Sequence, residues 1–233
     1  MPQTLKSLKT PLRYPGGKSR AISKLFQYMP SLADFNEYRE PFLGGGSMAL
    51  EVTKRYPALD IWVNDLYEPL YNFWRVLQED GQRLRDELIQ LKQRHIDRSS
   101  ARVLFGQAKE YLSGDPRNLE DFHRAVSFYV VNKCSFSGLT ESSSFSEQAS
   151  DSNFSIAGID RLPMYSSLIK DWRITNLSYE QMLTDDKAVF TYLDPPYDIK
   201  DNLYGRKGSM HKGFDHDTFA VDCDRFVGPQ LIS

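Results

Sequence analysis

A chain of 233 residues, 40% of them hydrophobic, can bury a full core, so its length predicts one large α/β domain with a sizeable insertion. Its net charge of -2 excludes a protein that coats nucleic acid by bulk attraction, and no apolar run indicates a membrane span, so we expect a cytoplasmic protein. Two cysteines exclude a disulfide scaffold and are expected to be reduced thiols, and the four histidines form no metal signature.

The amino-terminal stretch is basic and leads into a glycine turn. Residues 1–33 contain six lysines or arginines and no acid, which indicates either a basic patch or a solvated terminus. The turn, Tyr14 to Lys18, lets the backbone approach a ligand closely and places a lysine beside it. Its spacing is not that of a P-loop, which disfavours nucleoside triphosphate binding. A helix is expected over residues 20–28.

Two strands with ligand-binding features follow. A short strand near residue 40 runs into the glycines Gly44 to Gly46 and then a helix begun by Ser47, an arrangement that presents backbone amides to a nucleotide-like ligand. A second strand, residues 60–64, ends at Asp65, about twenty residues later, the offset at which an acid reaches ribose hydroxyls. The pair favours an adenosine-containing cofactor, and hydride transfer stays open although the strict Gly-x-Gly-x-x-Gly pattern is absent.

A helical region occupies the middle of the chain. Apolar residues at three- and four-residue intervals predict helices over residues 66–78, 81–94, 101–112 and 119–131. The arginines and lysines of this region indicate solvated helix faces, with contacts to backbone phosphates as a lesser alternative. Residues 132–157 are rich in serine with interspersed phenylalanines, and we expect a polar loop outside the core, either a recognition loop or a flexible connection.

Further elements lead to a buried strand. We expect a helix over residues 159–172, a strand over 173–177 and a short helix over 179–183. Residues 189–193 are all apolar or β-branched, which predicts a buried strand, and Asp194-Pro195-Pro196-Tyr197 ends it abruptly. In open α/β sheets this edge binds ligands, and the prolines restrict the backbone there. Taken alone, the four residues are as consistent with a stiff turn as with a catalytic site.

The carboxyl-terminal part is expected to continue the alternation of strands and helices. Residues 198–213 form a candidate lid, and His211 or His216 could act as a general base, although each is more simply a surface residue. A helix begun by Asp215 is expected over residues 214–226, and residues 230–233 resemble the start of a further strand. Because the chain stops there, we expect a truncated product.

Three motifs in order give a resemblance to a known family. They are Tyr14 to Lys18, then Glu40 to Ser47, and last Asp194 to Tyr197, with Asn64-Asp65 and residues 132–138 between them. This chain resembles the Dam-type, or D12 class, DNA N6-adenine methyltransferases. The resemblance implies an α/β, Rossmann-like methyltransferase sheet with a helical insertion. It also implies a catalytic domain over residues 1–65 and 158–233, and a target-recognition region over residues 66–157.

The resemblance implies S-adenosylmethionine as cofactor and an adenine in double-stranded DNA as substrate. It places a set of residues in the cofactor pocket: Tyr14, Gly17, Lys18, Glu40, Phe42, Gly44, Gly46, Asp65 and Asp194. It assigns catalysis to Asp194, Pro195, Pro196 and Tyr197. No metal and no obligate protein partner are expected, and a monomer is the default.

The residue types fit this chemistry. The Asp194 carboxylate and the Pro195 carbonyl could accept the two amine hydrogens of a flipped-out adenine while Tyr197 stacks on the base. Two alternatives stay open. One is an RNA guanine N2 methyltransferase, since some of these also carry Asp-Pro-Pro-Tyr. The other is a non-catalytic or truncated protein that binds S-adenosylmethionine or DNA. The recognition sequence is not readable, nor is the role in restriction, replication control or phage self-protection.

Overall fold

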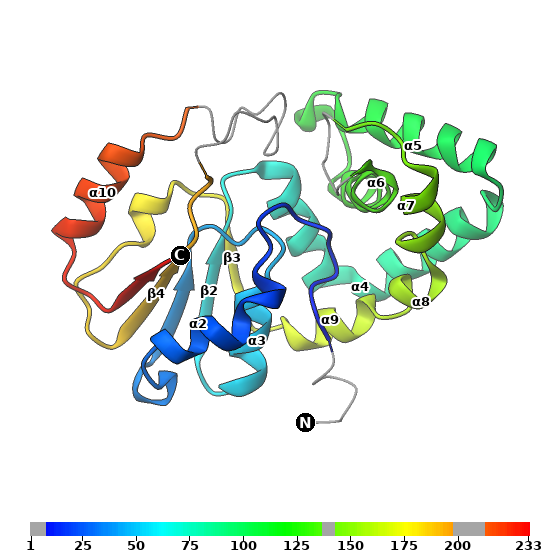
Figure 1. The fold of residues 1–233 in the computed structure, drawn as a ribbon. Helices are drawn as coiled ribbons and strands as arrows, with labels where there is room; N and C mark the ends of the chain where they lie inside the picture. Colours follow the sequence, from blue (N-terminus) through cyan, green and yellow to red (C-terminus); the bar gives the residue numbers. More distant parts are fainter. Residues whose placement is uncertain (1–7, 137–142, 198–212) are drawn as a thin grey trace.

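Five strands form one sheet in the computed structural model, which describes residues 8–136, 143–197 and 213–233. All neighbouring strands are parallel, in the order β3-β2-β1-β4-β5 (Figure 1). The strands are β1 Glu37–Glu40, β2 Asp60–Asn64, β3 Arg173–Thr175, β4 Val189–Leu193 and β5 Gln230–Ile232. Every residue of β4 is buried, as expected for a strand covered on both faces, and the predicted strand at 189–193 is confirmed.

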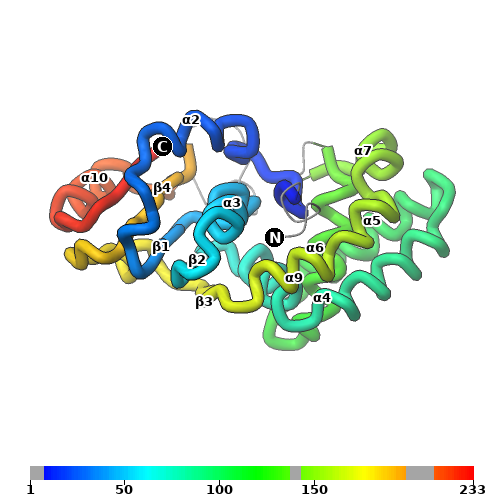
Figure 2. The backbone as a smooth tube through the Cα atoms, turned by 90° about the horizontal axis from the view of Figure 1, so that it is seen from below, coloured from blue at the N-terminus to red at the C-terminus, as the bar shows by residue number. Residues whose placement is uncertain are grey.

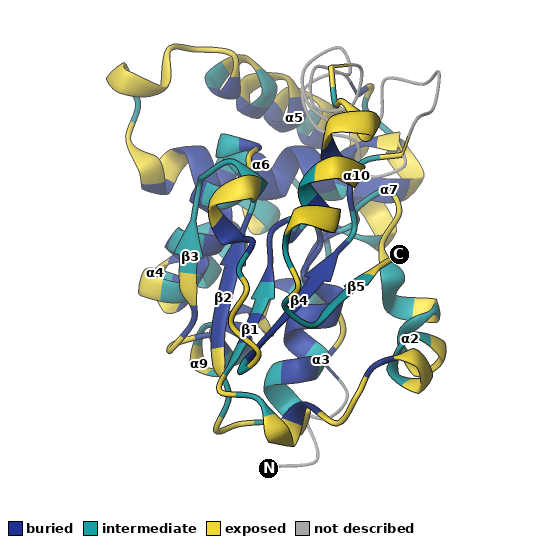
Figure 3. Cartoon of the chain, turned by 90° about the vertical axis from the view of Figure 1, so that its left-hand side faces the viewer, coloured by how far each residue is buried: buried dark blue, intermediate teal, exposed yellow. Residues whose placement is uncertain are grey.

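Helices cover both faces of the sheet. On one face lie α2 Ile22–Tyr28 and α3 Ser47–Arg55, and on the other lies α10 His216–Arg225 (Figure 3). Phe219 and Cys223 of α10 pack on Leu193 of β4. The Asp215 carboxylate accepts a hydrogen bond from the Thr218 amide at 2.9 Å, so this residue caps the helix as predicted.

In the described part of the chain between β2 and β3, six α-helices form a unit beside the sheet (Figure 2). They are α4 Glu68–Arg94, α5 Arg98–Leu112, α6 Asp121–Cys134, α7 Glu147–Ser152, α8 Ile156–Ile159 and α9 Leu162–Leu168. In Figure 1 the central helix, α6, is seen end-on with α4, α5 and α7 around it. Phe73 of α4 stacks on Tyr129 of α6, with ring centroids 5.9 Å apart, so aromatic packing holds this unit together.

One helix boundary differs from the prediction. The expected pair at 66–78 and 81–94 is confirmed, because α4 consists of two helices that meet at a kink at Asp80, where φ is -140° and ψ is 39°. The expected helix over residues 159–172 is shorter than predicted, because α9 covers only Leu162–Leu168 and residue 159 ends α8. Pro163 lies in the first turn of α9, where a proline starts a helix readily, which accounts for the later start.

The prediction that residues 132–157 lie outside the core was wrong. Phe154 is 1% exposed and packs on Tyr129 at 6.4 Å, and several polar side chains of this segment are buried with it. The reason is that its serines cap helices: Ser146 accepts from the Ala149 amide, and Ser155 accepts from the Gly158 amide. The caps begin α7 and α8, which place Ala149 and Ile159 among the buried residues, so the segment enters the core as short helices.

Two further findings bear on the fold. Cys134 and Cys223 are both buried and free, as predicted. Over the described ranges, no helix combines the length and the apolar character needed to cross a membrane.

Candidate active site

A cavity of about 330 Å³ opens at the carboxyl ends of β1, β2 and β4. The strand order reverses between β1 and β4, and open α/β sheets bind ligands at such a switch point. The cavity lining includes all the residues that the motifs single out. They are Tyr14, Gly17, Lys18, Glu40, Phe42, Gly44, Gly46, Asp65, Asp194, Pro195, Pro196 and Tyr197.

The glycine loop after β1 adopts a backbone that other residues rarely enter. Gly44 has φ of 50° and Gly46 has φ of 69°, both in the left-handed region. A Cβ atom on Gly46 would lie 2.7 Å from the ring of Trp74, which is fully buried. The indole nitrogen of Trp74 also donates to the Gly44 carbonyl at 3.1 Å. The loop therefore rests on this ring, and it lines the cavity in a conformation and at a distance from the ring that glycine allows.

Asp65 joins the glycine loop to the end of β2. One carboxylate oxygen accepts from the Gly44 amide at 2.8 Å, and the other accepts from the Tyr67 amide at 2.9 Å. Burial raises the pKa of Asp65 to about 6, while the two amides oppose that rise. The side chain therefore fixes the loop, and each oxygen keeps a lone pair for a ligand hydroxyl.

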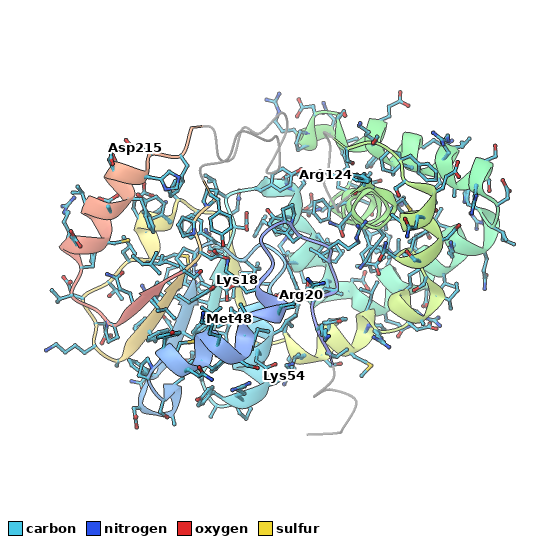
Figure 4. The ribbon with its side chains drawn as sticks, viewed as in Figure 1. Lys18, Arg20, Met48, Lys54, Arg124 and Asp215 are labelled. Atoms are coloured by element: carbon cyan, nitrogen blue, oxygen red, sulfur yellow. The ribbon has the colours of Figure 1, made fainter. Side chains whose placement is uncertain are left out.

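Asp194, Lys18 and Tyr197 form a charged cluster at the cavity wall (Figure 4 labels Lys18). The Lys18 ammonium lies 2.5 Å from both carboxylate oxygens of Asp194 and 2.5 Å from the Tyr197 hydroxyl. Burial acts to lower the pKa of Lys18, but the hydrogen bonds and charge of Asp194 and Tyr197 outweigh it, so the pKa is raised. The lysine is therefore charged, and it neutralises Asp194.

A second acid, Glu40, lies behind this cluster at the end of β1. Its side chain is 2% exposed and accepts a hydrogen bond from the Tyr38 hydroxyl at 2.7 Å. Burial raises the pKa of Glu40 to about 8, and the negative charge of Asp194 adds to that rise. Near neutral pH, Glu40 is therefore largely protonated and Asp194 has no second carboxylate beside it.

We expect replacement of Glu40 by glutamine to flatten the pH dependence of stability. The folded pKa of Glu40 lies near 8, above its ordinary 4.5, so its contribution is complete below 4.5 and is lost as the pH rises toward 8. The wild-type free energy of unfolding should therefore fall relative to the variant by up to about 1.4 kcal/mol per pH unit in that window. Urea unfolding at pH 5 and pH 8 measures the difference.

Glu51→Gln is the control for that measurement. Burial of Glu51 is outweighed by its hydrogen bonds to Lys54 and Arg55, which lower its pKa, so its contribution is present above its ordinary 4.5 and is lost only in acid. The difference between this variant and the wild type should stay constant from pH 5 to pH 8. A pH dependence in Glu40→Gln as steep as in the wild type would contradict the assignment.

An aromatic wall that the sequence did not indicate closes one side of the cavity. Phe42, Tyr179 and Phe214 pack together, with ring centroids 5.6 to 5.8 Å apart, and all three line the cavity. Tyr179 comes after β3, and Phe214 comes after β4 and just before α10. Because residues that follow parallel strands lie at the same edge of the sheet, the sequence could have indicated both rings as lining residues. His216 is exposed and packs on Phe214, whereas His211 and the candidate lid up to residue 212 lie outside the described residues.

Asn132 ties the amino-terminal motif to the helical unit. Its side chain, fully buried at the end of α6, accepts from the Arg13 amide at 3.0 Å and donates to the Arg13 carbonyl at 2.6 Å. The Arg13 guanidinium also donates to the Ser135 carbonyl at 2.8 Å. The turn that carries Lys18 to Asp194 therefore begins from a fixed point on the helical unit.

Comparison with known proteins gives a consistent set of relatives. Type II methyltransferase M.MjaIII of Methanocaldococcus jannaschii is 24% identical over 198 residues, which cover 80% of this chain and 68% of that protein. Type II methyltransferase M1.LlaDCHI of Lactococcus lactis is 21% identical, over 88% of this chain and 71% of that protein. The DNA N-6-adenine-methyltransferase of Escherichia phage P1 is 27% identical over 55% of this chain, but over only 15% of its own length.

The family model supports the same conclusion. The model for D12 class N6 adenine-specific DNA methyltransferases matches residues 14–232, nearly the whole chain. This range includes the glycine turn, the glycine loop and the Asp194 motif, all of which line one cavity. The resemblance drawn from the three motifs is thus confirmed, and the chain belongs to the D12 class of N6 adenine-specific DNA methyltransferases.

Proposed function

We propose that this DNA adenine methyltransferase uses S-adenosylmethionine to methylate the N6 amine of an adenine flipped out of duplex DNA. The observation that carries the proposal is the single cavity shared by the glycine loop and Asp194. The residues fit the cofactor, because glycines at positive φ leave room for it and Asp65 offers oxygens to ribose hydroxyls. The aromatic wall around Tyr179 offers an apolar surface to an adenine ring.

The same cavity offers acceptors for an adenine amine. The lone pair of this amine is delocalised into the ring, so the site must favour its return to the nitrogen. Asp194 and the Pro195 carbonyl would accept the two amine hydrogens, and the exposed ring of Tyr197 would stack on the base. When bound, S-adenosylmethionine supplies the electrophilic methyl group. Flipping costs a few kcal/mol, and stacking on one aromatic ring returns roughly 1–3 kcal/mol.

The reaction is tested by identifying its product. The purified protein is incubated with unmethylated duplex DNA and S-adenosylmethionine carrying a labelled methyl group, and the digested nucleosides are identified by mass. Labelled N6-methyladenine is the expected product, and sequencing of the methylated DNA then maps the site. A labelled base other than N6-methyladenine, or none from a sample that binds the cofactor, would overturn the proposal.

We infer that the target-recognition region expected from the sequence, residues 66–157, docks the DNA together with the Arg13 segment. Arg13 and Lys133 lie together beside the end of α6. Burial lowers the pKa of Arg13. Burial, followed by the charge of Arg13, lowers the pKa of Lys133 to about 8. Among the described residues, no carboxylate forms an ion pair with either cation. Phe136 projects nearby with 66% of its surface exposed. Two such cations beside an exposed ring fit a phosphate and an adjacent base.

We expect Lys133→Met to weaken the binding of duplex DNA and to change its salt dependence. Loss of one phosphate contact should reduce the slope of log affinity against log salt concentration by about 1. Fluorescence anisotropy between 50 and 200 mM salt would measure this slope. The control is Lys170→Met, because Lys170 is exposed and pairs with Asp171 at 3.3 Å. Equal slopes for the wild type and Lys133→Met would contradict the assignment.

A further inference from the structure

Lys18 lies on the reacting side of the cavity, against the carboxylate proposed to hold the amine. Its side chain is 14% exposed and that of Asp194 is 19% exposed, so the ion pair is largely shielded from water. The ammonium also approaches the Gly16 carbonyl at 3.3 Å and lies 5.0 Å from the centre of the Tyr197 ring. The glycine turn thus delivers a positive charge to the place where the base would dock.

The carboxylate of Asp194 has capacity for a further donor. Its Oδ1 accepts from Lys18, from the Ser233 hydroxyl at 3.1 Å and from the Tyr197 hydroxyl at 3.2 Å. Within the described residues, its Oδ2 accepts only from Lys18. A carboxylate offers about four lone-pair sites in all, so Oδ2 can accept an amine hydrogen while Lys18 stays in place. The ammonium and the amine would then share one oxygen.

If the amine of the base donates to Oδ2, the ring atoms on one side of that amine lie close to the Lys18 ammonium. In adenine, the carbon that carries the amine lies between N1 on one side and the carbon leading to N7 on the other, and both nitrogens accept hydrogen bonds. Cytosine has an acceptor on one side of its amine and a C–H on the other. Guanine has an acceptor on one side of its amine and an N–H donor on the other. Among amine-bearing bases, adenine alone offers an acceptor to a cation on either side.

We propose that Lys18 reads the target base, donating a hydrogen bond from its ammonium to the ring nitrogen, N1 or N7, that flanks the amine of adenine. The donor becomes available when Tyr197, whose hydroxyl now lies 2.5 Å from the ammonium, turns its ring onto the base. Asp194 holds the ammonium throughout. The inference rests on the proposed function and gives the glycine-turn lysine a role in base selection besides lining the cofactor pocket.

The test combines a protein change with a base change. Duplexes carrying the mapped site are made with adenine, 7-deazaadenine or 1-deazaadenine at the target, each analogue replacing one ring nitrogen by C–H. Single-turnover methylation is measured for the wild type and for Lys18→Met at saturating DNA and cofactor. The wild type should lose about 10- to 150-fold on one analogue, the range of a hydrogen bond to a charged group. Lys18→Met should be slower on adenine but lose no more than about twofold on that analogue.

Comparing the two proteins on the same analogue removes the change in amine reactivity that the analogue itself causes. If Lys18→Met is too slow to measure, the same ratios are taken from equilibrium binding with S-adenosylhomocysteine present. Lys24→Met is the matched control, because Lys24 is an exposed cation on the neighbouring helix α2, and it should keep the wild-type ratios. Thermal unfolding of Lys18→Met verifies its fold.

Each outcome separates the inference from the proposed function. Equal wild-type rates on adenine and both analogues would overturn the role of Lys18 while leaving adenine methylation intact. An equal loss in the wild type and in Lys18→Met would overturn it as well. Absence of N6-methyladenine from wild-type protein on unmodified DNA would instead overturn the function on which the inference rests.

Discussion

Asp194→Ala should lose methyl transfer by about 100- to 1000-fold while keeping the fold. That is the scale of removing one preorganised hydrogen-bond partner of a reacting group. Asp194 follows β4 in the cavity wall, where its carboxylate accepts from Lys18, Tyr197 and Ser233, and alanine removes both of these accepting oxygens. Its side chain is partly exposed, so its loss leaves no large void in the core. Single-turnover methylation would measure the rate, and thermal unfolding would check the fold.

Two further variants make that result specific. Asp194→Asn keeps one oxygen that can accept the amine hydrogen but loses the charge that holds Lys18, so its rate should lie between those of the wild type and the alanine variant. Asp217→Ala removes an exposed acid of α10 and should keep the wild-type rate. If Asp194→Ala retained a rate within tenfold of the wild type, the amine would have to be held elsewhere.

Gly46→Ala should destabilise the protein and impair cofactor binding together. Alanine at a φ of 69° is strained by roughly 1–3 kcal/mol, and its Cβ atom would lie 2.7 Å from a ring that is fully buried and cannot yield. The loop must then move from Trp74, which breaks the contact between the indole nitrogen and Gly44. We expect a lower unfolding temperature and at least about tenfold weaker binding of S-adenosylmethionine, by calorimetry.

Gly106→Ala is the control, because a Cβ atom at Gly106, in the interior of α5, would meet no atom within 4 Å apart from its chain neighbours and the nearby backbone of its own helix. Alanine there should stabilise the protein by about 0.4–1 kcal/mol and leave cofactor binding unchanged, because it reduces the freedom of the unfolded chain. Equal effects of the two substitutions would show that the conformation of Gly46 is not what shapes the pocket.

The sequence predicted the sheet edge better than it predicted the helical unit. Strands such as β4 were predictable because a parallel strand is buried on both faces and reads as a continuous apolar run. The candidate site was predictable because its residues follow strand ends and glycine turns. Phe154 was misplaced because composition does not reveal that neighbouring serines cap helices. The contact between Lys18 and Asp194 was missed because it joins residues 176 positions apart.

The contact between Asn132 and Arg13 sets a rule for building chimaeras between relatives. An exchange of only the helices between β2 and β3 would replace Asn132 while keeping the host's Arg13 segment. The incoming helices would then face an Arg13 backbone selected for another partner, and the host's turn would lose the fixed point from which it delivers Lys18 to its place. Swaps that transfer the amino-terminal segment together with the helices should therefore keep activity more often than swaps of the helices alone.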